Sequence, residues 1–317
     1  MHLESERTGM EWSHFYRQAK DFEKNLIQPD RLTVALNQAP LNINGVPAKT
    51  HVLVWGKGPD KPVVLCAGGL VNTAYRFAML AQTLCTEFEC VSFDWYGRGH
   101  SDHLQGPQSY GFESNVGQVQ ALLEMYKGRP IHFLGSSLGG MVAMAVFSQA
   151  QYVSNLRSLV LNDVGPRMSA GRRRRRAGAL NKPRVFKTPV ELREKVGISQ
   201  RDFGPVPQPI QDFLAYKNTR WCNQSAGRVY RYDMACMARF EQDSQFDVDL
   251  WHLWETIHCP QLLLHGALSD ALLPDQVQQM QQAKPDLKVV TVPDAGHTPS
   301  LCVESQVQML QQWLCSH

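Results

Sequence analysis

The residues best suited to chemistry lie around Ser137, in the run Gly135-Ser136-Ser137-Leu138-Gly139. An apolar run at 131–134 precedes it and a helix-forming run at 141–147 follows it. Gly-x-Ser-x-Gly between a strand and a helix is typical of a nucleophilic serine on a sharp turn. The two glycines of such a turn nearly touch, so a side chain at either position would collide. The sequence therefore predicts that Ser137 projects from the end of a sheet as a nucleophile.

A serine hydroxyl is a poor nucleophile and needs a positioned base. Among the eleven histidines, His297 stands out because it follows the apolar run 288–292 within a Gly-His pair. A loop at the end of the last strand would place the imidazole at the same sheet edge as Ser137. We therefore predict that His297 is the catalytic base.

The base in turn needs an acid that orients it, and two aspartates are candidates. Asp270 lies just beyond the strand expected at 261–265 and gives the chain order Ser, Asp, His that is expected for this architecture. Asp163 lies directly after the strand expected at 157–162 and is the alternative acid. The commoner placement of the acid after strand seven favours Asp270.

The tetrahedral intermediate of acyl transfer needs two amide donors aimed at its oxyanion. One donor should be the N–H of Leu138, the residue after the nucleophile. The other should come from the loop at 66–70, whose glycines allow close approach of the backbone. Gly69 is the predicted donor there, and Leu70 is the alternative.

Strands and helices alternate along most of the chain and would position these residues. The candidate strands are 31–36, 50–55, 62–67, 89–94, 131–135, 157–162, 261–265 and 287–292. Several are apolar on both faces, as in a parallel sheet covered on both sides. We therefore predict an α/β fold with a mostly parallel, eight-stranded, doubly wound sheet and a ligand site at the carboxyl ends of the strands.

Three regions follow from this pattern. Helical spacing of apolar residues at 10–27 predicts a helix in an N-terminal extension at 1–30, docked on the domain or open to a partner. The α/β core comprises 31–165 and 251–317. The intervening segment, 166–250, interrupts the alternation and contains helix-start signals, so we expect it to form a helical cap, or lid, above Ser137.

Composition narrows the class of protein. The chain has 317 residues, of which 43% are hydrophobic and 19% charged, and its net charge is +3. These values are typical of a soluble globular protein and give no reason to expect a nucleic-acid partner. The eight cysteines form no metal-type Cys-x-x-Cys pair. With no membrane-length apolar run and no signal-peptide pattern, a cytoplasmic protein is expected.

The run of five arginines at 172–176 is a local exception. It favours a solvated, mobile stretch, with attraction of an anionic partner as the alternative.

Taken together, these motifs resemble the α/β-hydrolase superfamily, and more narrowly its lid-bearing bacterial branch of serine esterases and C–C hydrolases. The resemblance covers about residues 40 to 315 and rests on five motifs, 97–102, 135–140, 162–166, 266–270 and 296–297. It implies hydrolysis through an acyl-serine intermediate with no cofactor and no metal. One departure is Ala67-Gly68, where family members usually carry His-Gly.

The leading hypothesis is a serine hydrolase that cleaves a small or medium carboxylic ester. A C–C bond hydrolase or lactonase with the same triad is the first alternative. A ligand-sensing protein with negligible turnover is the second, because a fold can be reused without its chemistry. The sequence leaves open whether the protein forms a homo-oligomer.

Overall fold

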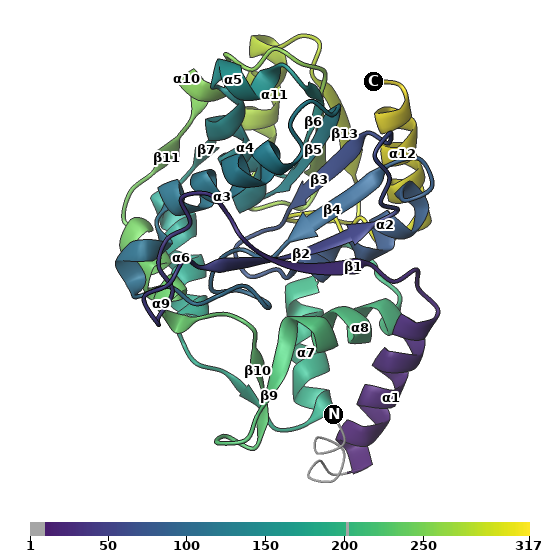
Figure 1. The fold of residues 1–317 in the computed structure, drawn as a ribbon, viewed down its shortest axis with the longest axis vertical. Coiled ribbons are helices and arrows are strands. Elements are labelled where there is room, and N and C mark those ends of the chain that lie inside the picture. Colours follow the sequence, from purple (N-terminus) through teal and green to yellow (C-terminus); the bar gives the residue numbers. More distant parts are fainter. Residues whose placement is uncertain (1–9, 201–202) are drawn as a thin grey trace.

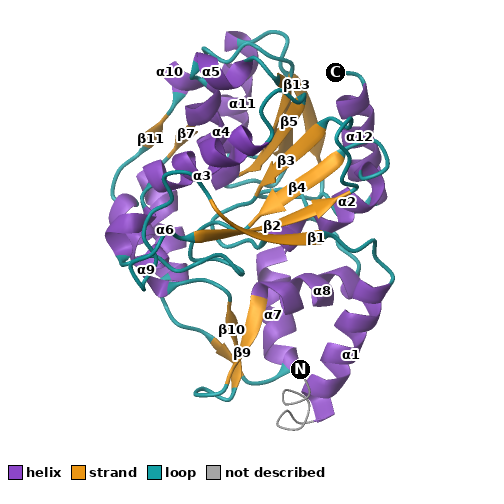
Figure 2. Ribbon diagram, in the orientation of Figure 1, coloured by secondary structure: helices purple, strands orange, loops and turns teal. Residues whose placement is uncertain are grey.

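The computed structural model describes residues 10–200 and 203–317. Its centre is an eight-stranded sheet in the order β1-β2-β4-β3-β5-β6-β12-β13 (Figures 1 and 2). The strands are β1 Asp30–Ala35, β2 Lys49–Trp55, β3 Val63–Ala67, β4 Glu89–Phe93, β5 Ile131–Ser136, β6 Leu156–Asn162, β12 Gln261–Gly266 and β13 Lys288–Val292. Strand β2 is antiparallel to both neighbours, and the pairs from β4 to β13 are parallel. The predicted α/β-hydrolase sheet is confirmed.

Helices cover both faces of this sheet. One apolar core lies between the sheet and α3, α4, α10 and α11, and a second lies between the sheet and α2, α8 and α12. The core helices are α2 Ala78–Leu84, α3 Phe112–Met125, α4 Leu138–Phe147, α5 Ala150–Val153, α10 Trp251–Trp254, α11 Pro274–Ala283 and α12 Glu304–Cys315, with 3₁₀ turns η1 Ala74–Phe77 and η2 Pro107–Tyr110. Burial on both faces explains why the central parallel strands are mostly apolar.

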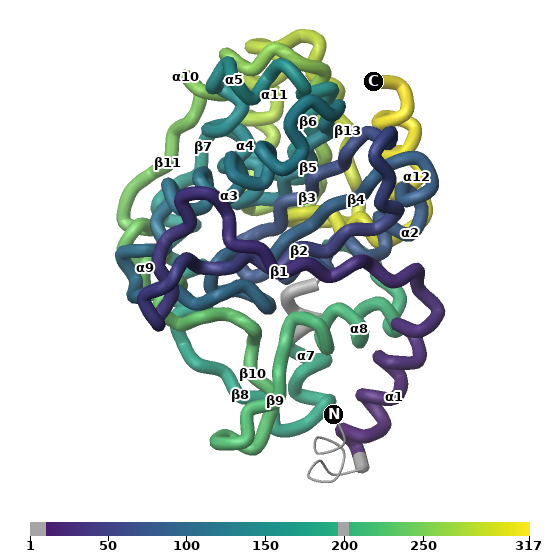
Figure 3. Tube along the Cα trace, viewed as in Figure 1, coloured from purple at the N-terminus to yellow at the C-terminus, as the bar shows by residue number. Residues whose placement is uncertain are grey.

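A long insert leaves the sheet after β6 and returns before β12, as the trace in Figure 3 shows. This is the expected position of the cap, and we use that name for residues 166–250. Its elements are β7 Arg167–Met168, α6 Ala170–Leu180, β8 Val185–Phe186, α7 Pro189–Gln200, α8 Gln208–Asn218, β9 Thr219–Cys222, β10 Gly227–Tyr230, α9 Met234–Asp243 and β11 Val248–Asp249. Helix α7 is preceded by Thr188, whose hydroxyl accepts from the Glu191 amide at 3.2 Å and caps its first turn.

The N-terminal helix α1, Met10–Lys24, lies beside α8 of the cap (Figure 1). The Trp12 indole N–H donates to the Lys187 carbonyl at 2.9 Å, and the Lys217 ammonium lies 2.6 Å from the Glu23 carboxylate. The extension therefore docks mainly on the cap, and its apolar face is buried there.

Candidate functional site

Ser137 occupies a strained turn between β5 and α4. Its backbone has φ 51° and ψ −111°, a conformation that residues with side chains rarely adopt. A Cβ on Gly135 would lie 2.5 Å from the Gly140 nitrogen, and one on Gly139 would lie 2.2 Å from the Ala67 carbonyl oxygen. Only glycine fits at these two positions, so the flanking residues force the turn that exposes the hydroxyl.

A hydrogen-bonded chain joins Ser137, His297 and Asp163. His297 Nε2 lies 2.9 Å from Ser137 Oγ, and its Nδ1 lies 2.8 Å from Asp163 Oδ2. Because a carboxylate can only accept, the hydrogen-bond network assigns the proton to Nδ1. Nε2 is then left to accept the serine proton. The structure thus brings the predicted nucleophile and the predicted base into direct contact.

Asp163 is held rigidly in this position. It follows β6 directly and is fully buried. Besides His297 it accepts from the Gly266 amide at 2.9 Å and from the Ser269 hydroxyl at 2.6 Å. Both carboxylate oxygens therefore have a hydrogen-bond donor. Its φ of 52° lies in the left-handed region, which Asp and Asn tolerate better than most residues.

The expectation that Asp270 contacts His297 is corrected by this geometry. The Asp270 side chain is 66% exposed and pairs with Arg172 at 3.0 Å. Asp163 stands at the end of β6, next to β5 and Ser137, whereas Asp270 is four residues beyond the end of β12. By that point the chain has reached the surface. The turn after β12 contributes Ser269 instead, which holds Asp163.

The loop that carries His297 is fixed by a buried cation that sequence reasoning did not single out. The Arg76 guanidinium is 3% exposed and donates to three consecutive carbonyls, those of Thr298, Pro299 and Ser300. Its Cζ also lies 4.4 Å from the ring centroid of Phe203. Since these carbonyls directly follow His297, Arg76 restricts the position of the imidazole. The only sequence signal is an arginine inside an otherwise apolar stretch.

Two backbone amides, those of Leu138 and Gly69, belong to residues beside Ser137. Leu138 is the first residue of α4, so its N–H has no acceptor within the helix. Gly69 also approaches closely, because a Cβ there would lie 3.6 Å from the Cβ of Ser137. The Gly69 amide donates to Asn72 Oδ1 at 3.0 Å. An oxyanion would have to share this donor with Asn72 or displace its side chain.

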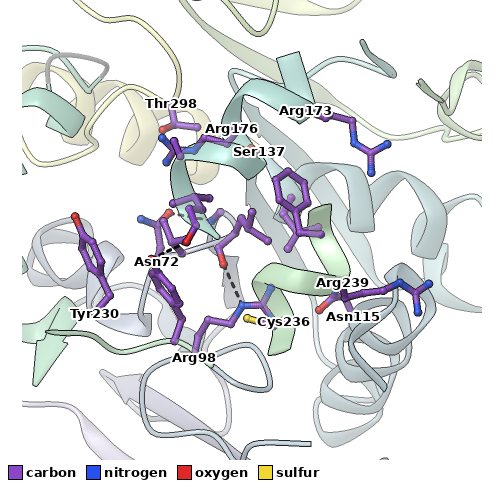
Figure 4. Close-up of a pocket in the computed structure, with 18 of the residues that line it drawn as sticks. Asn72, Arg98, Asn115, Ser137, Arg173, Arg176, Tyr230, Cys236, Arg239 and Thr298 are labelled. Atoms are coloured by element: carbon purple, nitrogen blue, oxygen red, sulfur yellow. Dashed lines mark hydrogen bonds between the residues drawn. The ribbon is translucent and has the colours of Figure 1, made fainter. Parts of the chain in front are cut away.

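A cavity of about 410 Å³ opens above Ser137 (Figure 4). This is within the usual size range of small-molecule sites. Core residues and cap residues both line it, which agrees with the expected place of the cap. Of the cap aromatics, Phe203, Tyr230, Tyr232 and Phe240 line the cavity, whereas Phe213 is buried in the core.

The arginine run at 172–176 forms part of α6 and does not behave as one solvated stretch. Arg172, Arg173 and Arg176 line the cavity, whereas Arg174 and Arg175 do not. Arg173 is buried and Arg172 half-buried, and the other three are exposed. Helical spacing divides the run, because positions four apart share a face. Helical spacing within the arginine run could therefore have indicated from the sequence which arginines line the cavity.

The environment of His297 lowers its pKa. Desolvation by burial is the main cause, and the positive charges of Arg172 and Arg176 add to it. The hydrogen bond and the charge of Asp163 act in the opposite direction. A lowered pKa keeps the imidazole neutral, which is the form that can accept a proton.

The described ranges, 10–200 and 203–317, contain neither a cluster of metal ligands nor a membrane-spanning helix. No group of three or more His, Cys, Asp or Glu side chains is arranged to hold a metal ion. Within the same ranges, every helix is too short or too polar to cross a bilayer.

The chain resembles known hydrolases in sequence and in fold. The chain is 28% identical over 278 residues to a 3-hydroxybutyrate-oligomer hydrolase of Cupriavidus necator, covering 84% of this chain and 94% of that protein. It is 25% identical to an N-formylmaleamate deformylase of Pseudomonas putida, covering 81% and 88%. A putative hydrolase from Rickettsia typhi shares the fold with a TM-score of 0.80 at 24% identity, covering 92% and 99%. Residues 63–307 match the profile of the Alpha/beta hydrolase family, and the protein belongs to that family.

Proposed function

We propose that the protein is a serine hydrolase that cleaves a small or medium carboxylic ester through an acyl-enzyme intermediate. The observation that carries the proposal is the chain from Ser137 Oγ through His297 to Asp163, with distances of 2.9 and 2.8 Å. Nucleophile, base and orienting acid in this arrangement are the parts that serine-based acyl transfer requires.

In the proposed reaction, Ser137 Oγ attacks the ester carbonyl carbon while His297 Nε2 takes the hydroxyl proton. The amides of Leu138 and Gly69 donate to the oxyanion. As the tetrahedral intermediate collapses, the C–O bond to the alcohol breaks and His297 returns the proton to the leaving oxygen. A water molecule then attacks the acyl-serine by the same route and releases the acid. Asp163 takes the role that the sequence had assigned to Asp270.

Support for an ester comes from one relative. Its name gives an oligomer of 3-hydroxybutyrate as the substrate, and hydroxy acids in a chain are joined by ester bonds. The name of the second relative gives removal of a formyl group. Cleavage of a C–C bond, a lactone or an amide would use the same residues and is distinguished by substrate.

The test is a panel of p-nitrophenyl esters with graded acyl length, run beside a vinylogous diketone and a lactone. We expect ester turnover, with a length optimum set by the cavity, and labelling of Ser137 by a fluorophosphonate probe. If the diketone or the lactone is hydrolysed and the esters are not, a C–C bond hydrolase or a lactonase is favoured. If the protein shows no turnover of any substrate and no labelling of Ser137, a sensing protein is favoured.

The activity should depend on pH as a neutral base requires. Only neutral His297 can accept the Ser137 proton, so kcat/KM rises with pH through the pKa of His297. Because burial and the nearby arginines lower that pKa, the midpoint should lie below the ordinary histidine value of about 6.5. A kcat/KM profile between pH 4 and 9 measures it, and a midpoint above about 7 would contradict the assigned environment.

A further inference from the structure

The side chain of Asn162 joins the segment that carries the nucleophile to the segment that carries the base. Asn162 is the last residue of β6 and is fully buried. Its Nδ2 donates to the Ser136 hydroxyl at 3.0 Å and to the Pro299 carbonyl at 3.1 Å. Because a carbonyl oxygen can only accept, the bond to Pro299 assigns the NH₂ group to this side of the amide. Both hydrogens of that group are used, one on each segment.

The order of the strands gives Asn162 its place beside the nucleophile. Strand β6 lies between β5 and β12, and Asn162 pairs in register with Ser136 at the end of β5. The Asn162 carbonyl also accepts from the Ser137 amide at 3.4 Å. The backbone of Asn162 is thus fixed to the turn that exposes Ser137, and the Ser136 hydroxyl orients its side-chain amide towards the loop of His297.

Asn162 and Asp163 bond that loop at positions two residues apart. Asp163 contacts His297 at 2.8 Å, and Asn162 contacts Pro299. Arg76 also donates to the Pro299 carbonyl, at 3.1 Å, but Arg76 belongs to η1. Arg76 therefore fixes the loop to η1, whereas Asn162 fixes it to the pair of strands that ends at the nucleophile.

The loop needs such bonds because its backbone is strained. Thr298 has φ 63° and Leu301 has φ 55°, both in the left-handed region that branched side chains disfavour. Strained conformations of this kind persist only where the surrounding structure holds them. Pro299 lies between these two residues, so loss of its bond to Asn162 should let the loop relax and move the imidazole.

Stability alone is a poor explanation for an asparagine at this position. The Asn162 Oδ1 is buried and has no hydrogen-bond donor among the residues that the structure describes. A buried acceptor without a donor lowers stability. The fold therefore gains less from Asn162 than from a side chain whose polar atoms are all paired.

We propose that Asn162 is a positioning residue, which sets the separation of Ser137 and His297 through its bond to the Pro299 carbonyl. Proton transfer between two side chains needs hydrogen-bond contact, and a misplacement of about 1 Å can lower a rate about 10²-fold. The proposal rests on the proposed serine mechanism and adds a residue that acts through the base.

Two substitutions at Asn162 test this role on a p-nitrophenyl ester that the wild type hydrolyses. In Asn162→Ala we expect kcat and kcat/KM to fall equally, by about 10²-fold, because the geometry lost is needed in the transition state. Asn162→Leu has no donor either but fills the space, and it should lose as much. Near wild-type kcat in Asn162→Ala would overturn the proposal. Near wild-type kcat in Asn162→Leu alone would also overturn it, because packing and not the hydrogen bond would then position the loop.

Ser158→Ala is the matched control for both substitutions. Ser158 lies on the same strand and the same face as Asn162, since alternate residues of a strand share a face. It is fully buried, and its hydroxyl lies 2.9 Å from His132 Nδ1. Because this bond is remote from the site, we expect a lowered Tm with a change in kcat of less than about threefold. A fall in kcat as large as that of Asn162→Ala would mean that lost stability explains both, and the positioning role would be wrong.

Amide hydrogen exchange over residues 297–302 tests the loop without any chemistry. Exchange should be faster in Asn162→Ala and Asn162→Leu than in the wild type and in Ser158→Ala. Unchanged exchange in the two Asn162 variants would overturn the proposal.

This measurement also separates the proposal from the proposed function. If the wild type hydrolyses no ester and is not labelled at Ser137, the proposed function fails, and faster exchange in the variants would still show that Asn162 holds the loop. If the wild type hydrolyses esters while exchange and kcat are unchanged in the variants, the proposed function stands and the positioning role fails.

Discussion

Replacing Asp163 with asparagine should lower kcat by about 10⁴-fold while the protein remains folded. Asp163 accepts from the fixed Gly266 amide on one oxygen and from the Ser269 hydroxyl and His297 on the other. The new NH₂ group cannot face the Gly266 N–H, so it must take the place of the oxygen beside His297. The Ser269 hydroxyl can no longer donate to this position and must turn its proton away. His297 Nδ1 must then accept as well, which moves the imidazole proton to Nε2.

With its proton on Nε2, His297 can no longer accept the proton of Ser137. Asparagine is the right replacement because the φ of 52° at this position suits Asn but strains most other residues. The measurement is kcat on the best ester of the panel, with thermal unfolding to verify the fold. Near wild-type kcat in Asp163→Asn would remove Asp163 from the mechanism.

Asp270→Asn is the matched control for that substitution. It makes the same chemical change at an aspartate that is 66% exposed and bound to Arg172. Surface ion pairs contribute little to the stability of the fold, so loss of this one should leave the site intact and change kcat by less than about threefold. A loss comparable with that of Asp163→Asn would restore Asp270 as the orienting acid.

The two aspartates show why sequence patterns located the site only in part. Ser137 and His297 were predictable because each has a local signature, a glycine-flanked turn and a Gly-His pair after the last strand. The choice between Asp163 and Asp270 depends on how far the chain has moved away from the sheet edge. Strand order places β6 beside β5, and this cannot be derived from the local sequence of either aspartate.

The sheet was predictable for a different reason. Its central parallel strands are buried on both faces, and apolar runs such as Leu262-Leu263-Leu264 indicate that directly. The cap carries no such signal, since its short strands and helices pack around a cavity. Aromatic residues in such an insert can line a cavity or pack in a core, and here Phe203 lines the cavity whereas Phe213 is buried in the core. Arg76 was missed because its partners are carbonyls, which leave no trace in side-chain patterns.

Ser137→Ala and His297→Ala should each lower kcat by up to about 10⁶-fold, and the double variant should fall no further. In forming the acyl-enzyme, His297 takes the proton of Ser137 and passes it to the leaving oxygen, and its Nε2 is hydrogen-bonded to Ser137 Oγ at 2.9 Å. Once either residue is absent, the proton transfer from Ser137 to His297 cannot occur, so removing the second residue has no further effect on kcat. The residual rate should come from the oxyanion donors and from binding, which both substitutions leave in place.

Ser136→Ala is the matched control, because it removes the neighbouring hydroxyl from the same turn. That hydroxyl accepts from the Asn162 side chain at 3.0 Å, which also donates to the Pro299 carbonyl at 3.1 Å. We expect a change in kcat of less than about tenfold, the effect of one hydrogen bond. Single-turnover rates of the four variants measure the coupling. If the two single losses multiply in the double variant, Ser137 and His297 act independently and the acyl-serine mechanism is wrong.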